Sequence, residues 1–178
     1  MKVARLKAAM DVKNDLDPDF LIIYRTDAIA VNGYEDARER ARRAIDLGVD
    51  MIFVEAMENM EQVERTAEEL HGVHLMLNLI EGGKTPLVPV KEAEEMGYNW
   101  IVPALTTLYS AAQGMYEVMS RVYSEDVSEN YMDKLIFFRE FTQVVRLDEI
   151  REKENLYLPS QILEEKYHGK DKIVETGE

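Results

Sequence analysis

Four short apolar runs, each ending abruptly on a polar residue or a proline, constrain the fold of this chain more than any other feature. The runs and the residues that end them are Phe20–Tyr24 before Arg25, Met51–Val54 before Glu55, His74–Leu77 before Asn78, and Trp100–Val102 before Pro103. A helix-like stretch joins each run to the next. Strands that are buried on both faces of a parallel sheet read as continuous apolar runs, and strands that alternate with helices indicate βαβ crossovers. The sequence therefore predicts a parallel α/β fold of the barrel type, in which the chemistry lies where the strands end.

The number of these units is half of what a closed barrel needs. The chain has 178 residues, whereas a full barrel typically takes about 250. We therefore predict a member of the TIM-type (β/α)8 barrel class that is here a half barrel of four parallel βα units with C-terminal helices. The predicted parts are a half barrel over 1–108, with strands near 20–25, 49–55, 73–79 and 98–103, a helical extension over 109–157 that could exchange between subunits, and a polar tail over 158–178.

The composition excludes several classes of function. Lys and Arg number 21 and Asp and Glu number 35, which gives a formal net charge of −14. A nucleic-acid surface needs a basic stripe, and an anionic membrane repels such a charge. Because there is no Cys, a disulfide framework, a zinc–thiolate site and a cysteine nucleophile are excluded. No run has the length of a membrane span or the pattern of a signal peptide. We expect a cytoplasmic protein that binds neither nucleic acid nor membrane.

Polar side chains at the ends of the first three predicted strands are the candidate functional residues. A guanidinium such as that of Arg25 can hold a carboxylate or a phosphate through two parallel hydrogen bonds. Glu55 would need a cation, a proton or hydrogen-bond donors at that depth, and Asn78 can both donate and accept. Two interpretations stay open: these groups bind a substrate, or Arg25 forms a structural ion pair with Asp27 or Glu55.

The loop after the third predicted strand is a weaker signal. Its sequence, Glu81–Pro86, contains two glycines that could bring backbone N–H groups close to an anion, and an ordinary connection explains it equally well. The histidines, His71, His74 and His168, do not form a ligand cluster. No metal-binding residues are predicted in this chain.

Several segments, taken in order, resemble the isocitrate lyase and phosphoenolpyruvate mutase superfamily. The matching segments are Ile22–Ala28, Gly33–Ala41, Gly48–Ala56, Asn78–Pro86 and Gly97–Pro103. Together they extend over about residues 3–157. Methylisocitrate lyase, dimethylmalate lyase and oxaloacetate decarboxylase-like members are the nearest in these motifs.

The resemblance implies a (β/α)8 barrel that assembles as a tetramer with exchanged C-terminal helices. It also implies a Mg²⁺ ion that stabilises an enolate while a C–C bond of a 2-oxo or 2-hydroxy acid breaks. The motifs assign substrate binding to Arg25, Glu55, Asn78, Leu79 and Ile80. Leu108 lies where methylisocitrate lyases carry a substrate-binding Arg, which disfavours a tricarboxylic substrate.

The matched strands correspond to the fifth through eighth of the family barrel. The half with the Asp pair that anchors Mg²⁺ and the gating Cys-Gly-His loop has no counterpart here, so we expect this chain alone to be inactive. In a first hypothesis it is the C-terminal half of a Mg²⁺-dependent carbon–carbon bond lyase for a small 2-hydroxy or 2-oxo carboxylic acid. In a second it is a non-catalytic half barrel that self-associates or complements a separate N-terminal half. In a third it is a non-functional remnant.

A fragment of a phosphonate-forming mutase or of an oxaloacetate decarboxylase-like enzyme also fits the motifs.

The first and last predicted strands would each have an open edge. Open edges recruit partners, so we expect the isolated chain to associate rather than to remain a monomer.

Overall fold

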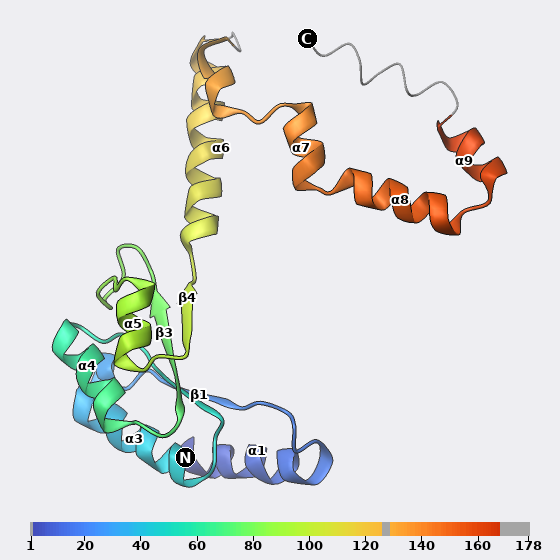
Figure 1. Cartoon of the computed structure of the whole chain (residues 1–178). Coiled ribbons are helices and arrows are strands. Elements are labelled where there is room, and N and C mark those ends of the chain that lie inside the picture. Colours follow the sequence, from blue (N-terminus) through green and yellow to red (C-terminus); the bar gives the residue numbers. More distant parts are fainter. Residues whose placement is uncertain (1, 126–128, 168–178) are drawn as a thin grey trace. The chain divides into compact units, whose positions relative to one another are not determined.

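The computed structural model describes residues 2–125 and 129–167. The chain divides between Ala111 and Ala112 into two compact units. The elements of the first unit, shown in Figure 1, are α1 (Lys2–Leu16), β1 (Ile23–Thr26), α2 (Ile29–Asn32), α3 (Tyr34–Asp46), β2 (Met51–Val54), α4 (Met60–Glu69), β3 (His74–Leu79), α5 (Val90–Met96), β4 (Trp100–Pro103) and the start of α6 (Thr106–Glu125).

A four-stranded parallel sheet is the frame of the first unit. Its strand order, β1-β2-β3-β4, follows the chain. In the register of the strands, Arg25 lies beside Phe53, and Met76 lies beside both Phe53 and Trp100. The predicted α/β fold with four parallel strands is confirmed. The first strand is shorter than its apolar run, because Phe20 lies outside β1 and is 61% exposed.

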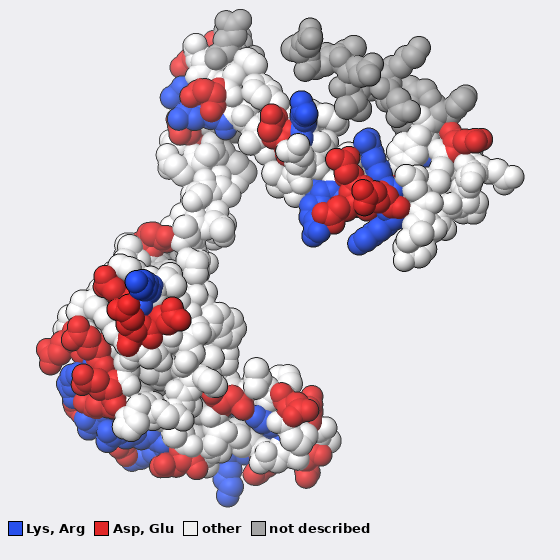
Figure 2. Space-filling model, in the orientation of Figure 1, with Lys and Arg blue, Asp and Glu red and all other residues white. Residues whose placement is uncertain are grey.

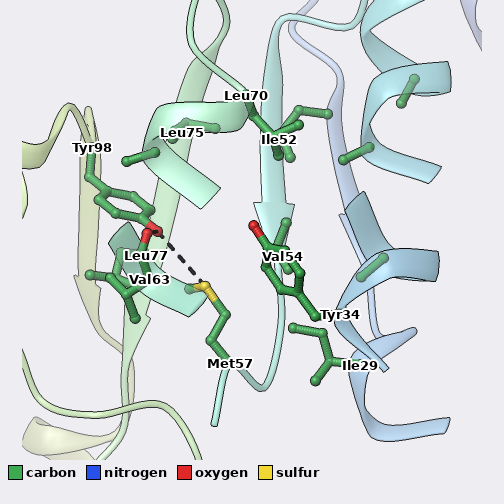
Figure 3. Close-up of a cluster of buried hydrophobic side chains, with 14 of the residues drawn as sticks. Ile29, Tyr34, Ile52, Val54, Met57, Val63, Leu70, Leu75, Leu77 and Tyr98 are labelled. Atoms are coloured by element: carbon green, nitrogen blue, oxygen red, sulfur yellow. Dashed lines mark hydrogen bonds between the residues drawn. The ribbon is translucent and has the colours of Figure 1, made fainter. Parts of the chain in front are cut away.

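Helices α3, α4 and α5 cover one face of this sheet and form the core with it (Figure 3). The strands contribute Ile52, Val54, Leu75 and Leu77, and the helices contribute Ala37, Ala41, Ala44, Val63, Ala67 and Ala93. The alanines let the helix backbones lie close to the strands. Tyr98 is hydrogen-bonded to α4. Its hydroxyl donates to the Val63 carbonyl at 2.9 Å and lies 3.8 Å from the Met57 sulfur (Figure 3).

Local signals set the ends of these helices. The Asn59 side chain accepts a hydrogen bond from the Gln62 backbone N–H at 2.9 Å, which satisfies one of the unpaired donors at the start of α4. Gly97 ends α5 in the left-handed conformation, with φ of 107°, which costs glycine little.

Helix α1 packs Met10 into the core and is also tied to the sheet by a carboxylate. Asp50 accepts hydrogen bonds from the Lys13 ammonium, at 2.6 and 2.8 Å, and from the Ile22 backbone N–H at 2.7 Å. The hydrogen bond from Ile22 and the pairing with Lys13 hold the pKa of Asp50 below its ordinary value. This junction lies at the amino ends of β1 and β2.

The other face of the sheet is not covered by any described helix of the first unit. We call it the open face; it carries Ile23, Arg25, Met51, Phe53, His74, Met76, Asn78, Trp100 and Val102. Ile23 is 39% exposed and Trp100 is 49% exposed. In Figure 2 the surface of the first unit next to β4 is white, whereas charged side chains gather over α3 and α4. Within the described part of the first unit, the sheet thus has one buried apolar face and one largely apolar face without a covering layer.

The second unit is helical. It contains the rest of α6, a 3₁₀ helix (Glu129–Lys134), α7 (Phe138–Val144), α8 (Leu147–Tyr157) and α9 (Ser160–Tyr167). No described residue of α6, α7 or α8 is buried, and side chains such as Phe138, 66% exposed, and Tyr157, 77% exposed, face solvent. Among the described helices, none combines the length and the apolar character that crossing a membrane requires.

The helices of the second unit are separated by two joints. Phe137 is extended and α7 begins only after it. Arg146, with φ of 54°, then separates α7 from α8. Periodicity reports which side chains are apolar and not the backbone angles at a joint. The sequence predicts a polar tail over 158–178. Helix α9 lies within this stretch, and residues 168–178 of the stretch lie outside the described residues.

Candidate substrate site at the carboxyl edge of the sheet

The parallel strands bring three of the predicted site residues to one face and one edge of the sheet. Arg25 lies on β1, Glu55 directly follows β2, and Asn78 lies on β3. Phe53 pairs with Met76, so two residues further on Glu55 lies level with Asn78. The carboxyl ends of parallel strands are the usual place of a ligand site in such folds.

Arg25 is held on several sides. Its Nε donates to both Asp27 oxygens at 3.2 and 3.3 Å, and Nη2 donates to Asp27 Oδ1 at 2.7 Å. Nη1 lies 3.3 Å from Glu55 Oε2. The guanidinium carbon lies 5.0 Å from the centre of the Phe53 ring, within cation–π range. Asp27 thus occupies the side edge of the guanidinium and Phe53 one flat face, while the side chain stays 51% exposed.

Two buried acceptors of the site lack hydrogen bonds. Glu55 Oε2, despite its ion pair with Arg25, and Asn78 Oδ1 have no hydrogen-bond partner among the described residues. A buried acceptor without a donor costs about 1–3 kcal/mol. Both atoms are suited to a hydroxyl, an amide N–H or an ordered water as donor.

The backbone next to Glu55 is strained. Ala56 has φ of 63°, a left-handed conformation that costs a residue with a Cβ about 1 kcal/mol or more. This strain turns the chain sharply away from the edge of β2, immediately after the Glu55 carboxylate. Strained residues cluster at binding sites, because the surrounding structure holds them there for function.

We call Arg25, Asp27, Glu55 and Asn78 the Arg25 cluster. The net charge of this cluster is negative. The hydrogen bond from Arg25 to Asp27, and the proximity of Glu55, raise the pKa of the guanidinium above its ordinary value, so it stays fully charged. One cation therefore faces two carboxylates, with Glu55 only 19% exposed. An anionic ligand would enter a site whose own charges sum to about −1, so its binding calls for a further cation.

The two remaining predicted residues play different parts. Leu79 packs against the helix-covered core, so its side chain points away from Arg25 and only its backbone could meet a ligand. Ile80 is half-buried, and its carbonyl accepts the Gly83 N–H at 2.9 Å, which closes a tight turn. A Cβ at Gly83 would lie 3.0 Å from that carbonyl, so a larger residue there would require a small shift of the turn.

The loop after β3 is also tied to the start of α6. The Thr106 hydroxyl donates to the Glu81 carboxylate, and this hydrogen bond lowers the pKa of Glu81. The Glu81–Pro86 loop therefore lies along the same carboxyl edge as the Arg25 cluster, rather than extending freely into solvent.

The residues present do not fit a metal ion. Within the described part of the chain, no group of three or more His, Asp or Glu side chains is placed to hold a cation. The two carboxylates nearest the site, Asp27 and Glu55, are both paired with Arg25.

Three further residues contribute to the site without a clear signal in the sequence. Phe53 reads as an ordinary strand residue, and only the register of β1 against β2 places its ring against Arg25. An alanine such as Ala56 carries no signal of a left-handed backbone. Thr106 could have been suspected only from its position shortly after Pro103, at the carboxyl end of the last strand.

Comparison with known proteins identifies a family. The model of the phosphoenolpyruvate phosphomutase family matches residues 1–123. The 2,3-dimethylmalate lyase of Eubacterium barkeri is 35% identical over 155 residues, which are 87% of this chain and 53% of that enzyme. The chain spans about half the length of the curated relatives it matches.

Solved structures agree with the fold. A crystal structure of 2,3-dimethylmalate lyase superposes with a TM-score of 0.77 at 30% identity, over 86% of this chain and 54% of the other. Oxaloacetate acetylhydrolase in complex with the product oxalate superposes with 0.76 at 33% identity, over 86% and 52%. Phosphonopyruvate hydrolase, solved with oxalate and Mg²⁺, shares the fold with 0.70 at 20% identity, over 88% and 55%.

Proposed function

Because the chain belongs to the phosphoenolpyruvate phosphomutase family, we propose that it forms one half of a Mg²⁺-dependent carbon–carbon bond lyase. The substrate is a small 2-hydroxy or 2-oxo carboxylic acid. The observation that carries this proposal is the Arg25 cluster, which presents a fixed guanidinium beside two acceptors without donors, Glu55 Oε2 and Asn78 Oδ1.

We propose a role for each of these groups. Asp27 holds the Nε and Nη2 side of the guanidinium, and Glu55 Oε2 lies 3.3 Å from Nη1. A substrate carboxylate would therefore bind the end-on edge, Nη1 and Nη2, beside Glu55. Glu55 and Asn78 would accept hydrogen bonds from the hydroxyl or from a water bound with the substrate. Fixing both ends of a small acid before reaction removes much of the entropy cost of the reactive geometry.

The cation is expected from outside this chain. Mg²⁺, when bound, would neutralise charge that develops on the oxygens of the substrate. The described residues do not provide its ligands, and the negative sum of charges around Arg25 disfavours an anion until a cation is present. We therefore propose that the lyase site is completed by the part of the barrel that this chain does not span. A cytoplasmic location, and the absence of nucleic-acid and membrane partners, remain predictions.

The test combines this chain with a complementary lyase fragment, defined as the part of the E. barkeri 2,3-dimethylmalate lyase that this chain does not span. The two are co-expressed, and cleavage of 2,3-dimethylmalate is measured with and without Mg²⁺. Arg25→Ala should lower kcat/KM about 10- to 100-fold, since a charged hydrogen bond to substrate contributes about 1.5–3 kcal/mol.

Arg43→Ala is the matched control, because Arg43 is a similarly exposed arginine whose ion pair, with Glu39, lies on α3. It should leave cleavage unchanged. Equal losses in the two variants, or cleavage by this chain alone, would contradict the proposed division of the site.

One observation favours a second candidate, a non-catalytic half barrel. The ion pairs of Arg25 with Asp27 and Glu55 are complete without a ligand, as a purely structural cluster would be. In that case the assembled pair would bind oxalate no better than the Arg25→Ala variant does. The phosphomutase description of the family model also keeps a phosphonate-forming reaction as an alternative, which an assay for phosphonopyruvate formation from phosphoenolpyruvate would detect.

A further inference from the structure

Phe53 lies within the open face, with its ring against the guanidinium of Arg25. It belongs to β2, an inner strand of the sheet, and the register places it between Arg25 on β1 and Met76 on β3. Although the described helices of the first unit do not cover this face, Phe53 is only 6% exposed. The Arg25 side chain, in contrast, is half exposed. The ring is therefore a fixed surface, and the guanidinium is the exposed group that rests on it.

The carboxylates around Arg25 fix the guanidinium within its plane but do not fix the tilt of that plane. Asp27 accepts from Nε and Nη2, and Glu55 Oε2 lies 3.3 Å from Nη1. The N–H groups of a guanidinium point outward within its plane, so hydrogen bonds to them act along the plane. A contact on the flat face resists tilting. The Phe53 ring, whose centre lies 5.0 Å from the guanidinium carbon, makes such a contact.

The tilt of this plane matters to a ligand that binds the end-on edge, Nη1 and Nη2. A carboxylate that accepts two parallel hydrogen bonds lies in the plane of the two donors. If the guanidinium tilts, the bound carboxylate moves away from Glu55 Oε2 and Asn78 Oδ1. These two acceptors are buried in the described structure, so they do not follow the movement of Arg25. A substrate that contacts all three groups would then bind less tightly.

We propose that Phe53 is a positioning residue of the candidate site, which holds the plane of the Arg25 guanidinium so that its end-on edge meets the substrate beside Glu55. The inference rests on the proposed function, because it takes Arg25 as the group that binds the substrate carboxylate. Phe53 needs no contact with the substrate for this role, since it acts through Arg25.

The first measurement is made on the full chain alone and does not depend on catalysis. The Arg25 Nε–H signal is assigned in proton–nitrogen correlation spectra by its loss in Arg25→Ala. The ring current of an aromatic face shifts a proton above it upfield, so the signal should move downfield in Phe53→Leu and in Phe53→Met. Phe53→Tyr keeps the ring and should keep the signal near its wild-type position. Circular dichroism identifies the variants that fold, and two non-aromatic replacements are made so that one misfolded variant does not remove the test.

The second measurement is made on this chain co-expressed with the complementary lyase fragment. For 2,3-dimethylmalate, kcat/KM should fall about two- to five-fold in Phe53→Leu, which corresponds to the roughly 0.5–1 kcal/mol of a cation–π contact at an exposed site. The loss should appear in KM, because a tilted guanidinium weakens the binding of the substrate before its bond breaks. A merely structural role would instead lower kcat, by reducing the folded fraction of the enzyme.

Two further variants show whether the effect passes through Arg25. In the Arg25→Ala background, Phe53→Leu should have no additional effect on kcat/KM, because the group that it positions is already absent. Met76→Leu is the matched control, since Met76 lies beside Phe53 on β3 and the replacement conserves volume. It should leave the Arg25 signal, kcat and KM unchanged.

The outcomes separate this inference from the proposed function. An Arg25 signal that stays in place in the folded non-aromatic variants overturns the inference, whether or not the pair is active. Equal KM values for wild type and Phe53→Leu in an active pair overturn it as well, as does an equal loss in the Arg25→Ala background. If the wild-type pair does not cleave 2,3-dimethylmalate, the proposed function is contradicted. The affinity of the pair for oxalate with Mg²⁺ then replaces KM, and equal affinities of wild type and Phe53→Leu would contradict the positioning role.

Discussion

Replacing Asp50 by Asn should weaken the attachment of α1 to the sheet and lower the free energy of unfolding by an amount that depends on pH. The Asp50 carboxylate bonds to the Lys13 ammonium and to the Ile22 N–H. The Lys13 side chain is only 8% exposed, and that of Asp50 is 27% exposed. Asparagine can still accept from Ile22 through its amide oxygen, but it leaves the buried ammonium without a counter-charge.

The magnitude follows from these contacts. A hydrogen bond to a charged group contributes about 1.5–3 kcal/mol, and breaking a buried ion pair costs about 3–5 kcal/mol. Because one side of this pair is partly exposed, we expect Asp50→Asn to lower the free energy of unfolding by about 2–3 kcal/mol at pH 7. Asp11→Asn, on an exposed residue of the same helix, should change it by no more than about 0.5 kcal/mol.

The sign of the pH dependence is fixed by the lowered pKa of Asp50. A carboxyl group whose pKa is lower in the folded state contributes its full stabilisation above the unfolded value of about 3.9, and loses it as the pH falls through the folded value. The difference between wild type and Asp50→Asn should thus be constant above about pH 5 and shrink below about pH 4.

Urea unfolding followed by circular dichroism from pH 3 to 8 measures this difference. A double-mutant cycle with Lys13→Met should return a coupling of about 1–2 kcal/mol at pH 7. The reasoning fails if the deficit of Asp50→Asn is the same at pH 3 and pH 7, or if Asp11→Asn matches it.

Three further substitutions test other parts of the first unit by urea unfolding. Tyr98→Phe removes the hydroxyl that donates to the Val63 carbonyl, which lies within α4 and keeps its backbone hydrogen bond. Stability should therefore fall by about 1 kcal/mol, and an unchanged midpoint would mean that water replaces the hydroxyl. Asn59→Ala removes the cap that accepts from the Gln62 N–H and should cost about 1 kcal/mol, whereas no loss would show that α4 does not need it. Ala56→Gly should raise stability by about 0.5–1 kcal/mol, because glycine adopts a φ of 63° without strain; a loss would indicate that the Ala56 methyl group contributes packing.

Much of the architecture can be read from local pattern. Runs such as Met51–Val54 are apolar because the sheet buries them, and the intervening segments repeat apolar residues at helical spacing. Glycines such as Gly48 and Gly97, both with positive φ, end the α3 and α5 segments. Polar residues at the ends of parallel strands must share an edge, so Arg25 and Glu55 could be placed together before any coordinates.

What lies around those residues could not be predicted. Whether Arg25 stacks on Phe53 depends on the register of β1 against β2, and a shift by one residue would turn the ring to the other face. That Asp27 takes one side of the guanidinium depends on a side-chain conformation, and the strain at Ala56 depends on the turn that follows β2. These are non-local or conformational facts that periodicity does not encode.

The sequence by itself determined the kind of layers in this protein, four parallel strands with helices between them, and these are half the strands that a closed barrel needs. Hydrophobic spacing carries that information because burial acts on each segment separately. Only the tertiary structure decided that the described helices of the first unit leave one face of the sheet uncovered, with Trp100 half exposed, and that the Arg25 cluster has more negative than positive charge. Those properties arise from which segments meet, and that is settled when distant parts of the chain pack together.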